Sequence, residues 1–106
     1  MPGPDIGLRL RVEVALLSTD DGGRKSPIRD GYRPISVVGT GDDELLIGLA
    51  QLRLARELAP GDSGVGTLEF SRSVAELAKA KLPPGADFAL AEGRKVVGRA
   101  QVLKVV

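Results

Sequence analysis

Few residues of this 106-residue chain could carry out acid–base or nucleophilic chemistry, because it contains neither histidine nor cysteine. Their absence removes the commonest general base, the thiol nucleophile and the usual ligands of a structural zinc ion. Residues 61–64 read Gly-Asp-Ser-Gly, the sequence around the nucleophile of chymotrypsin-like proteases. Ser63 would need a histidine base to act in that way. We therefore interpret this segment as a turn and expect no catalytic residue.

Carboxylates gather in two turns, Asp20 and Asp21 in one and residues 42–44 in the other. Oxygen ligands of this type could bind Ca²⁺ or Mg²⁺, but the spacing of an EF-hand loop is missing. Acidic residues in turns commonly cap and solvate the backbone. We expect neither a metal site nor a cofactor.

Two glycine turns, which we call the glycine corners, are each followed directly by cations. The first corner comprises Gly22, Gly23, Arg24 and Lys25, and the second comprises Gly93, Arg94 and Lys95. Backbone amides at a glycine turn, together with an adjacent cation, can hold a phosphate. Nucleic-acid binding needs several such contacts, and the net charge of the chain is only +1. Two interpretations stay open: phosphate-facing corners, or solvated turns, which are the commoner use of such residues.

The pattern of apolar residues predicts the elements that carry these corners. Strict alternation over residues 8–16 predicts a half-buried strand. Apolar and β-branched residues on both sides of Gly93 predict a hairpin over residues 88–106, with a positive φ at Gly93 and also at Gly23. Turn formers recur at short intervals, as an all-β sandwich or barrel requires. Ser73 lies three residues before a glutamate, the spacing of a capping box, which predicts one short helix near residues 74–81.

Residues 44–58 allow two interpretations. Leu45, Leu49 and Leu52 lie on one helical stripe, and the propensity of the segment favours a helix. Gly48 argues against a long helix, and residues 52–55 also alternate as in a strand. The pattern alone does not decide between helix and strand.

Four short motifs follow one another in a recognisable order: Asp-Gly-Gly-Arg at 21–24, Gly-Tyr-Arg-Pro at 31–34, Pro-Gly-Asp at 60–62 and Phe-Ala-Leu-Ala-Glu-Gly at 88–93. In this order and spacing they resemble the C-terminal β-barrel domain of elongation factor Tu, over residues 8–106. The resemblance implies an all-β fold, a six-stranded antiparallel closed barrel with strands within residues 44–58 and the helix near 74–81 as an insertion. It implies one domain over residues 8–106 after a flexible N-terminus, residues 1–7.

The resemblance also implies roles for particular residues. In that family the matching glycine corners lie on the side of the barrel that meets the T stem of aminoacyl-tRNA. Tyr32 would pack at a corner of the barrel, and Arg33 would hold a carboxylate. The chain departs from the family at residues 35–43, which have lost the family's aromatic residues, and the sequence has no G-x-x-x-x-G-K-[ST] loop for a nucleotide phosphate.

These observations lead us to expect a non-catalytic binding module in the cytoplasm that acts on a translation-related protein or on tRNA. The alternative is a domain mimic or regulatory partner that competes with elongation factor Tu for a toxin, an exchange factor or a modifying enzyme. A small enzyme that uses carboxylates alone is a third possibility, for which no paired acidic residues stand out. No segment is apolar over the length of a membrane span or begins like a signal peptide, so we expect no membrane partner.

Apolar residues over 45–49 exceed what one face of a strand can bury. An exposed leucine patch is a liability unless a partner covers it. We therefore expect an interaction surface that includes Leu45, Ile47 and Leu49 and supports a weak homodimer or a hetero-complex.

Overall fold

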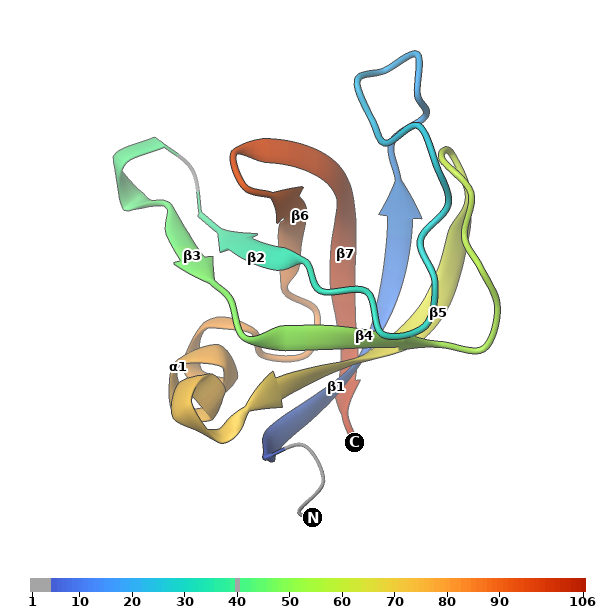
Figure 1. Ribbon diagram of the computed structural model, residues 1–106. Coiled ribbons are helices and arrows are strands. Elements are labelled where there is room, and N and C mark those ends of the chain that lie inside the picture. Colours follow the sequence, from blue (N-terminus) through green and yellow to red (C-terminus); the bar gives the residue numbers. More distant parts are fainter. Residues whose placement is uncertain (1–4, 40) are drawn as a thin grey trace.

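A computed structural model describes residues 5–39 and 41–106 of the chain. These residues form one antiparallel sheet, a short 3₁₀ helix and one α-helix, α1. Figure 1 shows that the sheet curls strongly around the core, with α1 beside the lower end of the curl. The elements are β1 Ile6–Leu16, β2 Ile35–Val38, the 3₁₀ helix Gly41–Asp43, β3 Leu45–Ile47, β4 Ala50–Leu54, β5 Ser63–Ser71, α1 Arg72–Lys81, β6 Asp87–Glu92 and β7 Lys95–Val105.

The sheet is an open half-barrel of seven strands, in the order β3-β2-β6-β7-β1-β5-β4. The expected closed barrel of six strands is therefore wrong, although the mainly β fold with one short helix is confirmed. The physical reason lies at Leu49, whose φ of 56° breaks an extended chain between β3 and β4. β3 then pairs with β2, while β4 pairs with β5 at the far edge of the sheet. Strand pairing also overrides the helical propensity of residues 44–58.

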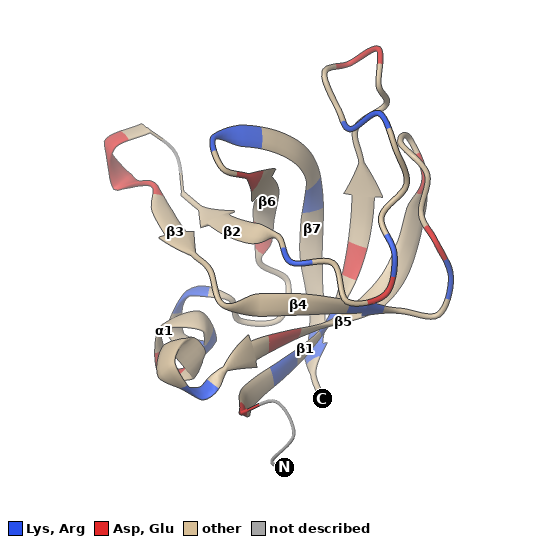
Figure 2. Ribbon diagram, in the orientation of Figure 1, with Lys and Arg blue, Asp and Glu red and all other residues tan. Residues whose placement is uncertain are grey.

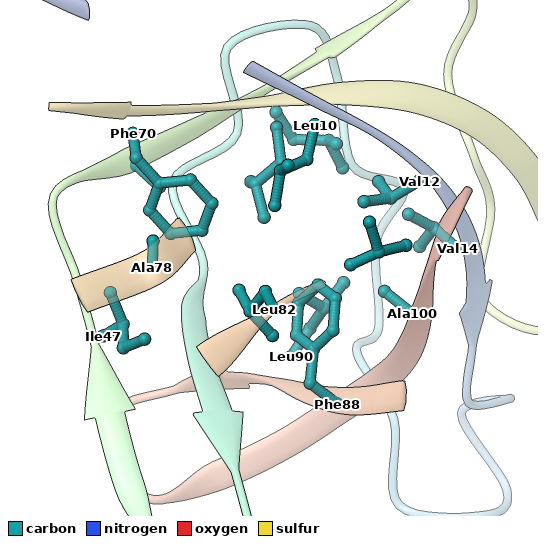
Figure 3. Packing of buried hydrophobic residues seen from close by; sticks show 14 of the residues in the cluster. Leu10, Val12, Val14, Ile47, Phe70, Ala78, Leu82, Phe88, Leu90 and Ala100 are labelled. Atoms are coloured by element: carbon teal, nitrogen blue, oxygen red, sulfur yellow. The ribbon is translucent and has the colours of Figure 1, made fainter. Parts of the chain in front are cut away.

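Strand β1 lies in the middle of the half-barrel and pairs with β5 on one side and β7 on the other. Its alternate residues Leu8, Leu10, Val12, Val14 and Leu16 are buried, which confirms the predicted half-buried strand. The same core includes both phenylalanines and residues from β3, β4, β6, β7 and α1 (Figure 3). A fully buried leucine, valine or phenylalanine contributes about 1.5–3 kcal/mol relative to its exposed state, so this cluster dominates the folding free energy.

Helix α1 covers one end of the core with small side chains. Ala75 and Ala78 are buried, and the following Leu82 is buried as well. The helix approaches β1 closely at Gly7, where an added Cβ would lie 2.7 Å from the Cα of Arg72. The predicted helix is confirmed, but its cap is not at Ser73: Ser71 is the N-cap, and its side chain accepts a hydrogen bond from the backbone N–H of Ser73. β5 continues directly into the helix, so the last strand residue takes the capping position.

The hairpin of β6 and β7 is confirmed. Gly93 has a φ of 59° at the first position of the two-residue turn, as in a type II′ turn. The register shifts between Leu90 and Ala91, so Val97 of β7 is the extra residue of a β-bulge. Of the expected flexible N-terminus, residues 1–4 lie outside the described residues, whereas Ile6 and Gly7 belong to β1.

The cap assignment predicts different effects for two neighbouring serines. Ser71→Ala should lower the free energy of unfolding by about 1 kcal/mol, because it removes the acceptor for the first turn of α1. Ser73→Ala should cost clearly less, since Ser73 already lies inside the helix. Urea denaturation followed by circular dichroism measures both. A larger loss for Ser73→Ala would contradict the assignment.

Candidate functional site

The structure brings the two glycine corners together at one end of the sheet. The first corner follows β1, and the second joins β6 to β7; Figure 2 shows their basic residues at the same end of the molecule. Glu92, the last residue of β6, forms the link. Its Oε2 atom accepts a hydrogen bond from Nη1 of Arg24 and another from the hydroxyl of Tyr32. One carboxylate thus ties two residues of the connection between β1 and β2 to the distant β6–β7 hairpin.

Arg24 is held from several directions. Its Nε atom donates to the carbonyl oxygen of Ser26 at 3.1 Å, and its Nη2 atom lies 3.2 Å from the hydroxyl of the same serine. The guanidinium carbon also lies 5.1 Å from the centroid of the Tyr32 ring, within cation–π range. Arg24 is therefore a structural clamp, and most of its donors are not free for a phosphate.

This cluster shifts the pKa values of two of its members. Burial raises the pKa of Tyr32 far above its usual value, and the hydrogen bond to Glu92 adds to the effect. Burial would also raise the pKa of Glu92, but the hydrogen bonds from Tyr32 and Arg24, with the positive charges of Arg24 and Lys95, outweigh it and lower that pKa. Glu92 is therefore a carboxylate and Tyr32 a neutral hydrogen-bond donor at neutral pH.

The other cations of the two corners point to solvent. Lys25, Arg94 and Lys95 are exposed, and none of them forms an ion pair within the part of the chain that the structure describes. Of the three, Lys95 lies close enough to Glu92 for its charge to act on that carboxylate. Across the described ranges, no group of acidic residues is arranged to hold a metal ion. No helix among the described residues is both long enough and apolar enough to cross a membrane.

Glycine is required at the two positions of the first corner for different structural reasons. Gly22, and not Gly23, has the positive φ, 92°. Gly23 is required for another reason: a Cβ at this position would lie 2.3 Å from the carbonyl oxygen of Leu17. The expectation of positive φ is thus confirmed at Gly93 and wrong at Gly23, where close packing of two backbone segments is the constraint.

The predicted apolar surface is only partly exposed. Leu49 is 67% exposed, but Ile47 is 1% exposed and lies in the core, and Leu45 packs against that core. Ile47 must therefore be removed from the expected surface, because β3 alternates and turns it inward. Leu46, on the opposite face of β3, is 57% exposed and replaces it. This alternation was the signal in the sequence that could have identified Leu46.

A cleft of about 350 Å³ adjoins Leu49 at the junction of β3 and β4. Ile6, Ile35 and Leu49 give it an apolar lining, and its polar lining residues include Arg33, Gln51 and Glu69. The resemblance implies that Arg33 holds a carboxylate, and for the described residues this expectation is wrong. Among the described residues, Arg33 makes no ion pair or side-chain hydrogen bond, so its charge is available at the cleft.

These features define a class of structure: a small, strongly curled antiparallel β domain with one short helix. The chain matches no protein-family model. It is 36% identical over 97 residues to elongation factor Tu 2 of Streptomyces avermitilis, an alignment that takes in 92% of this chain and 23% of that protein. The chain is therefore a homologue of elongation factor Tu that spans about a quarter of its length, the extent of a single domain, which confirms the resemblance seen in the motifs.

The corner geometry predicts an order of effects for glycine substitutions. Gly23→Ala should destabilise most, by roughly 2 kcal/mol or more, because backbone atoms must move to admit the Cβ. Gly93→Ala should cost about 1 kcal/mol through its positive φ alone. Arg94→Ala, at the exposed neighbour of Gly93, is the control and should change little. Chemical denaturation gives the three values, and equal stability of Gly23→Ala and Arg94→Ala would overturn the packing argument.

The Glu92 cluster predicts a pH dependence of stability. The pKa of Glu92 is lower in the folded chain than the usual 4.5. The stabilisation of the fold by this carboxylate is therefore present above that value and is lost as the pH falls through the folded pKa. Glu92→Gln should therefore be clearly less stable than the parent at about pH 7, and the difference should shrink towards about pH 3. Glu57→Gln, which breaks an exposed ion pair with Arg29, is the matched control. A pH-independent difference for Glu92→Gln would contradict the cluster's role.

Proposed function

We propose that this domain is a non-catalytic binding module of the cytoplasm that recognises a protein of the translation apparatus, with tRNA as the other candidate ligand. The proposal rests on homology to part of elongation factor Tu and on one structural observation. Exposed Leu49 lines a largely apolar cleft that also contains Arg33, which has no ion-pair partner among the described residues, and Leu46 is exposed three residues earlier in the chain.

The side chains around the cleft favour a protein ligand. Two large exposed leucines beside apolar cleft walls provide the buried centre that protein interfaces require. Arg33 at the same place would select a partner with a carboxylate next to an apolar side chain. Apolar packing also continues beyond the cleft, which supports a protein ligand. Ile35 lines the cleft and packs against a second apolar cluster, formed by Val37, Ala89 and Ala91.

The support for tRNA is weaker and comes from the glycine corners. Lys25, Arg94 and Lys95 are exposed there, but Arg24 is already bound to Glu92. Three cations provide few phosphate contacts, so RNA binding through the corners would be weak and would fall steeply with salt.

A second candidate function is competition with elongation factor Tu for a protein ligand such as a toxin, an exchange factor or a modifying enzyme. Homology to part of elongation factor Tu favours it, since a domain related to a larger protein can bind the same partner. A weak homodimer through Leu46 and Leu49 is a further way of covering the same surface.

The test uses the surface leucines. The chain and its Leu49→Asp variant are immobilised and exposed to nuclease-treated lysate of the source cells, and bound proteins are identified by mass spectrometry. A translation protein should bind the parent and be lost at least about tenfold with Leu49→Asp, since a charge at the centre of an apolar contact is costly. Leu103→Asp, at an exposed leucine on β7, is the control and should retain binding.

Two further measurements separate the alternatives. Added elongation factor Tu should displace the captured protein if the two compete, and light scattering at high concentration should reveal a dimer if the leucines pair with a second copy. A salt-dependent mobility shift of labelled tRNA, abolished in Arg94→Ala, would instead favour the corners. If no translation protein is captured and no tRNA shift occurs, the proposed function is wrong.

A further inference from the structure

A row of cations crosses the outer face of the sheet far along β1 from the glycine corners. Strand register places Lys104 of β7 opposite Arg11 of β1, Arg11 opposite Thr67 of β5, and Thr67 opposite Arg53 of β4. Facing residues of neighbouring strands project from the same side of a sheet. We call these four residues, three cations and one threonine, the basic row; Figure 2 shows the basic segments of β1, β4 and the end of β7 in the same part of the molecule.

The basic row contains an unfavourable contact between like charges, and no residue of the row compensates for it. Like charges directly opposite each other on adjacent strands are destabilising, and Arg11 faces Lys104 in this way. Arg11 is also half-buried, and its Nε atom is buried without a hydrogen-bond partner among the described residues. A buried donor of a charged group is normally satisfied. An anion beside Arg11 would supply both the missing acceptor and the missing negative charge.

The surface provides room for such an anion. A hollow of about 510 Å³ is lined by Arg11 and Arg53, with Thr67 and Gly66 between them, and Asp30 lines it on the side of Arg53. Arg53 is fixed in position, because its Nε atom donates to Oε1 of Glu69 at 3.1 Å and its Nη1 atom lies 3.5 Å from Oδ2 of Asp30. A guanidinium on each side and a threonine hydroxyl in the middle form a suitable set of donors for a tetrahedral oxyanion.

We propose that the hollow between Arg11 and Arg53 is a binding site for a single phosphate group. Lys104 adds to the positive field on the other side of Arg11, which favours a doubly charged anion over a carboxylate. Three carboxylates, those of Glu13, Asp30 and Glu69, border the row. They would repel a run of successive phosphates, so the site suits a small phosphate-bearing molecule and not an RNA strand. This inference does not depend on the proposed function, because it involves neither the cleft nor the corners.

The test is a titration of the full chain with inorganic phosphate at constant ionic strength, followed by NMR. The amide signals of Gly66 and Thr67 should shift and saturate, and phosphate should raise the melting temperature relative to chloride, because a ligand that binds only the folded state stabilises it. Arg11→Gln should weaken binding by about tenfold or more, as expected for loss of hydrogen bonds to a charged group. This variant should melt in chloride at or above the parent temperature, which shows that it folds.

Arg99→Gln is the matched control, since Arg99 is an exposed arginine of β7 that lies opposite Ala15 and outside the basic row. It should bind phosphate like the parent. Shifts that rise linearly without saturation, or equal affinities of the parent and Arg11→Gln, would overturn the proposal. So would a short RNA oligonucleotide that binds the row more tightly than inorganic phosphate and loses that affinity in Arg11→Gln.

Discussion

The structure depends on the pairing of β1 with a partner on each side. Because β5 and β7 both bond to it, β1 has no free edge, and its inward residues are among the most deeply buried of the chain. Because side chains alternate between the two faces of a strand, the burial of these residues determines which residues of β1 face outward. Arg9, Arg11 and Glu13 must project from the outer face, and the same strand leads directly into the loop that carries Arg24. A shift of one residue in this register would turn the charges into the core.

A second constraint is the shared carboxylate of Glu92. Arg24 and Tyr32 belong to a long connection between β1 and β2, which contains no helix or strand. Two donors on one partly buried oxygen anchor that connection to the β6–β7 hairpin. The cations of the corners therefore have different roles. Arg24 is bound to Glu92 and maintains the structure, while Lys25, Arg94 and Lys95 are exposed to solvent.

Much of this fold follows from local patterns, and the exceptions depend on how segments of the chain come together in space. Alternation identified β1, and Gly93 identified the closing hairpin, because each depends on residues that are adjacent in the sequence. The motif order was needed to assign strands to residues 44–58. Local patterns did not reveal the break at Leu49, the cap at Ser71, the burial of Ile47 or the tight packing at Gly23. The break at Leu49 and the burial of Ile47 are decided by distant segments, through the ladder to β5 and the core. The cap at Ser71 and the packing at Gly23 involve nearby residues, but they depend on where β5 ends and on how the chain folds back onto Leu17.

An open half-barrel leaves two strand edges, and this chain protects each of them differently. β3 is only three residues long and follows the acidic turn Gly41–Asp43, which limits its use as a template for another strand. The edge of β4 is occupied by the chain itself: Leu52 exchanges backbone hydrogen bonds with Gly31 and Tyr32, and the N–H of Leu54 donates to Asp30. Strand addition is therefore a poor route of recognition for this domain. A partner must be selected by side chains on the curved outer faces, where substitutions can change specificity without disturbing the backbone ladder.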